Sequence, residues 1–156
     1  MPEHTTSARE LADRLQAGAP RPALTPLIEG CACAEEVRAG LFLLNGDWKR
    51  AHQVAQRIRS PIGAHWHALV HRHEPDEANS RYWLRQVGNS PIYPALAQAA
   101  REAGQEAPLT PDGQWDPQRF TDCYAEPAHD RWTRPLDRLE LRALLEHCLE
   151  HCLEPR

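Results

Sequence analysis

The stretch from residue 60 to residue 88, SPIGAHWHALVHRHEPDEANSRYWLRQVG, decides the fold. Ser60-Pro61 is the pairing of N-cap and first-turn residue with which many helices begin. Pro75 ends this first helix, because the residue before a proline avoids the helical region. Asp76 then caps a second helix, which Gly88 ends. The stretch therefore predicts two consecutive helices joined by a tight turn.

The same signals recur along the chain, and no segment shows the strict alternation of polar and apolar residues typical of a strand. Helices are expected over residues 7–18, 34–44, 47–58, 61–74, 76–87, 90–104, 116–124 and 136–153, with a loop over 105–114 and irregular structure over 126–135. We therefore predict an all-α protein, a single domain over residues 1–156 made of seven to nine short helices packed as antiparallel hairpins. Its ordered core is expected over 34–153, with the helix 7–18 at the periphery.

A weak internal repeat supports the hairpins. Asp47 and Asp76 each precede a second helix, and Ser60-Pro61 and Ser90-Pro91 each follow one. The spacing of about 30 residues is near the 34 residues of a tetratricopeptide repeat. The sequence thus has a distant tetratricopeptide-like character.

Composition narrows the function classes. With 18 basic and 22 acidic residues the net charge is −4, which argues against a nucleic-acid partner. No apolar run approaches the roughly 18 residues of a membrane span. The five cysteines form no C-x-x-C pair, and residues 1–6 lack the features of a secretory signal, so we expect a cytoplasmic protein with reduced thiols.

Histidines point to a functional site. Nine are present, and four fall between residues 65 and 73. His67 and His71 are four residues apart and share a helix face, which suits two ligands of one metal ion. Residue 68 is alanine, so the glutamate base of the zincin motif is missing. A third ligand would come from Glu74, Asp76 or another helix, while His65 and Arg72 are expected to point toward solvent.

Neighbouring helices add polar and aromatic side chains. If the helices 47–58, 61–74 and 76–87 pack as consecutive neighbours, their side chains could surround one pocket, walled by Trp48, Trp66, Tyr82 and Trp83. The candidate ligand-binding residues are His52, Gln56, His67, His71, Arg72, Glu74, Asn79, Tyr82 and Arg85. The predicted ligand is a small anionic molecule, alone or associated with a divalent transition metal. Arg72 or Arg85 would hold its negative group, and histidine would be the acid–base group of an enzyme.

The central stretch also resembles an uncharacterised all-α family of soluble bacterial and fungal proteins with the motif W-H-x3-H-R-x-E-x-D-x2-N-x2-Y-W, here residues 66–83. The resemblance covers about residues 40–150 and extends to His52, Gln56, Glu140 and Cys148. His73 stands where arginine is expected, and the cysteine after Trp115-Asp116-Pro117 is displaced. The resemblance implies no activity.

Two alternatives stay open. The helical hairpins could form a tetratricopeptide-like interaction module without catalytic activity, whose groove binds a protein partner or a second copy of the chain as a homodimer. The polar stripe of His67, His71 and Glu74 on the helix 61–74 could also serve helix packing alone. Near the end of the chain, Glu146-His147-Cys148 and Glu150-His151-Cys152 form a tandem duplicate, more typical of cysteines packed against a core than of a soft-metal site.

Overall fold

The computed structural model describes residues 6–16 and 21–152, and these residues form helices and loops without a strand. The all-α prediction is thereby confirmed. Within these two ranges the elements are α1 (Ala8–Gln16), η1 (Pro22–Leu24), α2 (Thr25–Gly30), α3 (Glu35–Leu44), α4 (Trp48–Ala55), α5 (Pro61–His73), α6 (Glu77–Val87), α7 (Tyr93–Glu102), α8 (Glu106–Leu109), α9 (Pro117–Tyr124), η2 (Pro127–His129) and α10 (Asp130–His151).

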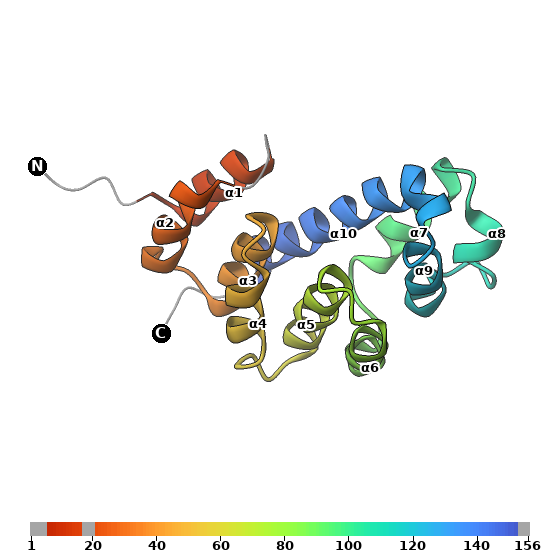
Figure 1. Cartoon of the computed structure of the whole chain (residues 1–156), viewed down its shortest axis with the longest axis horizontal. Coiled ribbons are helices and arrows are strands. Elements are labelled where there is room, and N and C mark those ends of the chain that lie inside the picture. The colour runs from red at the N-terminus through yellow and green to blue at the C-terminus, as the bar shows by residue number, and fades with distance from the viewer. Residues whose placement is uncertain (1–5, 17–20, 153–156) are drawn as a thin grey trace, which may run out of the picture.

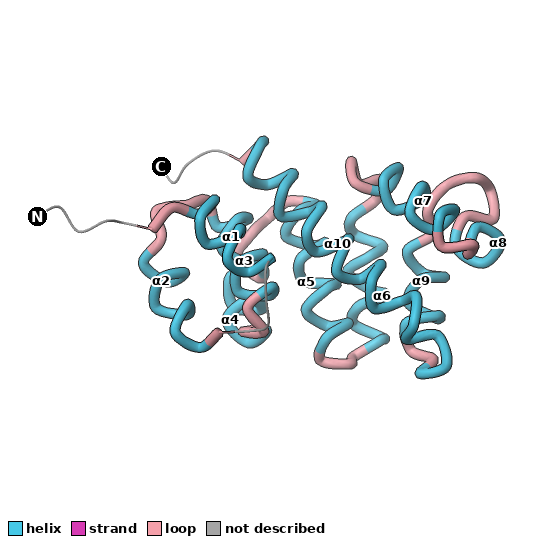
Figure 2. Tube along the Cα trace, turned by 90° about the horizontal axis from the view of Figure 1, so that it is seen from above, coloured by secondary structure: helices cyan, strands magenta, loops and turns pink. Residues whose placement is uncertain are grey.

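The helices α3 to α6 pack as consecutive neighbours, each against the next along the chain (Figure 1). The long helix α10 runs beside this row and contacts α1 and α3 as well as α7 and α9. Figure 2 shows that α10 extends from the N-terminal helices toward α7 and α9. The last helix therefore connects α1 and α3 with α7 and α9.

Helix starts explain most of the boundaries. The Ser60 side chain accepts a hydrogen bond from the Gly63 amide, and Asp76 accepts one from the Asn79 amide, as the sequence predicts. Asp116 caps α9 in the same way. Asp47 does not cap α4, because Oδ2 of its carboxylate accepts hydrogen bonds from Thr25 and Asn45 instead. Here the carboxylate ties the turn before α4 to α2.

Other boundaries differ from the prediction. α4 ends at Ala55, three residues before the predicted end. α7 begins at Tyr93 and not at Pro91, because Ser90 Oγ accepts a hydrogen bond from the Ile92 amide and does not cap a helix that begins at Pro91. The predicted loop 105–114 contains the four-residue α8. α10 begins at Asp130, although residues 126–135 were expected to be irregular. Pro135 is only the sixth residue of this helix, so its missing amide costs one hydrogen bond near the helix start.

The helices α3, α5 and α10 pack closely against one another at the centre of the core. Trp66 of α5 is fully buried against Gly40 of α3, where an added Cβ would lie 2.7 Å from the Trp66 ring and 3.0 Å from Leu145 of α10. Only glycine allows this approach. α1, for which the sequence suggests a peripheral place, buries Leu11, Ala12 and Leu15. Among the described residues, no helix combines the length and apolar character that crossing a membrane requires.

Candidate metal centre

Three histidines converge where α4 meets α5. The Nε2 atoms of His52 and His67 lie 3.0 Å apart. The ring centroid of His71 lies 4.9 Å from that of His67 and 5.3 Å from that of His52. One ring nitrogen of each residue lies within 4.8 Å of the other two. We call these three residues the histidine cluster.

Local helical geometry produces the cluster. His67 and His71 are one turn apart on α5, so their rings stack with an interplanar angle of 21°. His52 reaches them from α4 because α4 and α5 are packed neighbours. His67 and His71 are buried and His52 is half-buried, so the cluster has one side nearer to solvent.

Two neighbours hold the rings in place. His71 Nδ1 lies 3.1 Å from Glu74 Oε1, so the carboxylate accepts a hydrogen bond from Nδ1–H, and in this tautomer of the neutral ring the lone pair is on Nε2. This is the outer carboxylate that commonly orients a metal-bound histidine. On the other ring, Trp83 of α6 stacks on His67 at 4.0 Å between centroids. The orientation of both α5 histidines is therefore fixed from outside the cluster.

The electrostatics favour a neutral imidazole at His67. Burial, together with the nearby His52 and His71, lowers the pKa of His67 to about 4. At neutral pH this ring is uncharged, and its 3.0 Å contact with His52 is a hydrogen bond in which one of the two Nε2 atoms carries the proton, so metal binding at both atoms requires that ring to change its tautomer. In a tetrahedral zinc site with Zn–N bonds of 2.0–2.1 Å, ligand nitrogens lie about 3.3 Å apart. The 3.0 Å between His52 and His67 needs only a small adjustment to reach that spacing.

A second acidic group lies beside the cluster. His71, Glu74 and Asp76 also place ligand atoms within 4.8 Å of one another. However, the Asp76 carboxylate already accepts hydrogen bonds from the Asn79 amide and from Asn79 Nδ2. We therefore assign Glu74 to the orientation of His71, and Asp76 to the cap of α6.

The other predicted pocket residues lie outside the cluster. Gln56, Asn79 and Arg85 are exposed, and 47% of Tyr82 is exposed. Trp48 is 37% exposed, and Trp66 is buried in the core against Gly40. Of the four predicted aromatic walls, the structure thus places Trp83 directly on the cluster.

The prediction that His65 and Arg72 point toward solvent is wrong. Both are buried, and both face α10. Arg72 Nη1 lies 2.7 Å from Glu140 Oε1 and 3.0 Å from Asp137 Oδ1, and His65 Nε2 lies 2.8 Å from Glu140 Oε2. His73 bonds Asp137 at 2.9 Å. We call these five residues the buried charge network.

Charges in this network stabilise each other. Burial disfavours ionisation of Glu140, but Arg72 and His65 outweigh it and hold the pKa of this carboxyl below its ordinary value. Burial likewise opposes the charge of Arg72, and the two carboxylates outweigh it and raise the pKa of the guanidinium. Arg72 is thus held in the core and joins α5 to α10. The sequence signal for this network is the pair Asp137 and Glu140, which are three residues apart on one face of α10 among leucines and could indicate buried carboxylates.

Comparisons with protein-family models, curated proteins and solved structures find no match to this chain. The resemblance to the bacterial and fungal family stays a prediction. The function is therefore inferred from the chain's own geometry.

Proposed function

We propose that this protein binds one divalent transition metal ion through His52, His67 and His71, with a further coordination position open to water or a small anion. The observation that carries the proposal is the convergence of three imidazole nitrogens within 4.8 Å from two helices. The low pKa of His67 and the carboxylate on His71 support it, since metal ligands must be deprotonated and oriented.

The donor set indicates the class of metal and ligand. Imidazole suits zinc, copper, iron and nickel. Three histidines with an open position are typical of reactive zinc sites, whereas structural zinc sites usually use four protein ligands. Three neutral imidazoles leave the charge of the metal uncompensated, which favours a small anion in the open position.

Metal analysis of tagless protein tests the proposal. We expect about one equivalent of metal in the parent and its loss in the double variant His67→Ala/His71→Ala. The matched control is His147→Ala/His151→Ala, because these rings are also one turn apart, with centroids at 4.5 Å, at the far end of α10. The control should retain the metal. Circular dichroism checks that both variants fold.

Either of two results would overturn the proposal. One is a parent protein that binds no zinc, nickel or cobalt when each is supplied. The other is a metal that survives in the first double variant. A Co²⁺ spectrum adds a direct readout of ligand type, and its change on adding azide reports the open position.

The alternative of an interaction module remains a prediction. The exposed large apolar side chains of the described chain lie on four different helices: Leu27 on α2, Trp48 on α4, Tyr82 on α6 and Leu139 on α10.

A further inference from the structure

An apolar groove lies between the end of α7 and the start of α10. It has a volume of about 630 Å³ and opens to solvent, since Pro135 and Leu139 on its α10 side are exposed. Its lining residues are Ala99, Glu102, Ala103, Gln105, Arg131, Trp132, Pro135, Leu136 and Leu139. The groove shares no residue with the histidine cluster, so its role is independent of the metal proposal.

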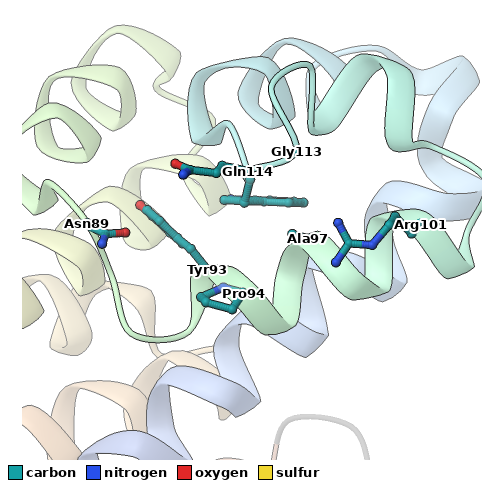
Figure 3. Close-up of a pocket in the computed structure, with 8 residues that line it drawn as sticks. Asn89, Tyr93, Pro94, Ala97, Arg101, Gly113 and Gln114 are labelled. Atoms are coloured by element: carbon teal, nitrogen blue, oxygen red, sulfur yellow. The ribbon is translucent and has the colours of Figure 1, made fainter.

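The two sides of α7 have different surroundings. On one side, Pro94 and Ala97 border a cavity with Gln114 of the loop that joins α8 to α9 (Figure 3). Ala99 and Ala103 lie about half a turn away around the helix, because each residue advances an α-helix by about 100°. These two small side chains belong to the groove. The loop thus borders one side of α7, and the other side forms one wall of the groove.

The helix α10 has apolar residues on two faces. One face is buried in the core and includes Leu141 and Leu144. The other face holds Trp132, Pro135 and Leu139, which are three or four residues apart and therefore form a stripe along the groove. Leu139 is 38% exposed, so this stripe reaches the surface. An apolar stripe at the surface is typical of a face that binds another protein.

One charge of each sign flanks the groove. Glu102 is the last residue of α7, Arg131 is the second residue of α10, and both are exposed. Glu102 accepts a hydrogen bond from Gln98 at 3.1 Å, and within residues 6–16 and 21–152 neither Glu102 nor Arg131 forms an ion pair. They are the two charged residues of the lining, so the net charge of the groove is zero.

This arrangement of charges is complementary to itself. In a dimer with two-fold symmetry, residue i of one copy meets residue j of the other, and j meets i. A two-fold axis along the groove places Glu102 of each copy against Arg131 of the other, and each α7 against the other α10. A strongly acidic or strongly basic partner would instead meet a like charge on one of the two walls. The charges therefore favour a second copy of the chain as the occupant.

We propose that this protein forms a symmetric homodimer through the groove between α7 and α10, with Glu102 and Arg131 paired between the two copies. The stripe of Trp132, Pro135 and Leu139 supplies most of the affinity, because ion pairs exposed to solvent contribute little. The two ion pairs set the relative orientation of the copies, since complementary charges at the rim of an interface determine its register.

Sedimentation equilibrium of the full chain tests the dimer over protein concentrations from about 1 μM to about 1 mM, which covers weak and moderately tight association. The mass should rise with concentration toward twice that of the chain. Glu102→Arg should weaken the dimer at least about tenfold, because the symmetry turns two ion pairs into two contacts between arginines. The double variant Glu102→Arg/Arg131→Glu should restore the affinity of the parent, since it exchanges the two charges.

Glu150→Arg is the matched control for the charge reversal, because Glu150 is also exposed and lies at the far end of α10. It should leave the dimer affinity unchanged. Leu139→Lys tests the apolar stripe separately from the charges and should also weaken the dimer at least about tenfold. Circular dichroism checks that each variant folds, as the exposure of the replaced side chains leads us to expect.

Four results would each refute the proposal. The parent could be a monomer throughout the concentration range. Glu102→Arg could dimerise as strongly as the parent, or Leu139→Lys could do so. The double variant could also fail to regain the affinity that Glu102→Arg loses, which would show that Glu102 and Arg131 do not pair between the copies.

Discussion

Replacing Arg72 by methionine should destabilise the protein more than any exposed charge change. Methionine keeps much of the volume but leaves Glu140 and Asp137 buried without their arginine, with His65 and His73 as their remaining partners. The Arg72 side chain is 2% exposed, and those of Glu140 and Asp137 are 0% and 6% exposed. Removing one partner of a buried ion pair costs about 3–5 kcal/mol, because the remaining charge is desolvated and uncompensated.

The chain contains a matched control for this prediction. Arg9 Nη1 lies 2.7 Å from Glu146 Oε2, the same distance that separates Arg72 Nη1 from Glu140 Oε1, but the Arg9 and Glu146 side chains are 49% and 41% exposed. Arg9→Met should therefore cost only about 0–1 kcal/mol. The nitrogen–oxygen distance is equal in the two pairs, so the comparison contrasts a buried arginine, which also bonds Asp137, with an exposed one.

Urea unfolding followed by circular dichroism measures both free energies. Thermal unfolding should show a fall of about 6–20 °C for Arg72→Met, at 2–4 °C per kcal/mol for a chain of this size. Replacing Arg72, Asp137 and Glu140 together by apolar residues should restore much of the lost stability. The reasoning is refuted if Arg72→Met costs no more than Arg9→Met, or if the triple variant is less stable than Arg72→Met.

Two further predictions concern α5. Gly63→Ala should destabilise the protein by about 1–3 kcal/mol or more, because the new Cβ would lie 2.2 Å from Ile58 O. Gly30→Ala is the control and should be tolerated, because a Cβ there would meet nothing within 4 Å. Equal urea midpoints for the two variants would contradict this prediction. His67 should titrate by NMR with a pKa of about 4. Since its unfolded-state pKa is about 6.5, the unfolded chain binds the proton first, and the free energy of unfolding should fall as the pH drops from about 6.5 to about 4. His67→Asn should reduce that dependence, and an unchanged pH profile would show that His67 is not its source.

Much of the fold could be predicted because helix starts are local. Ser60, Asp76 and Asp116 bond amides two or three residues away, so the sequence alone contains both partners. Asp47 is the exception, since Thr25 and Asn45 compete for its carboxylate. The pairing of His67 with His71 is also local, as it follows from the period of one helix.

The buried charge network could not be predicted in this way. Arg72 and Glu140 are 68 positions apart, and nothing near either residue reveals the other. From the sequence around it alone, Arg72 is interpreted as a solvent-exposed residue on an amphipathic helix.

The position of α10 has a consequence for synthesis. During translation the helices α3 to α6 leave the ribosome before α10, so His65 and Arg72 emerge without Asp137 and Glu140. A guanidinium cannot enter an apolar interior alone, which keeps the nascent row of helices loosely packed. The packing of α5 around His65 and Arg72 is thus completed only after the last helix has been made.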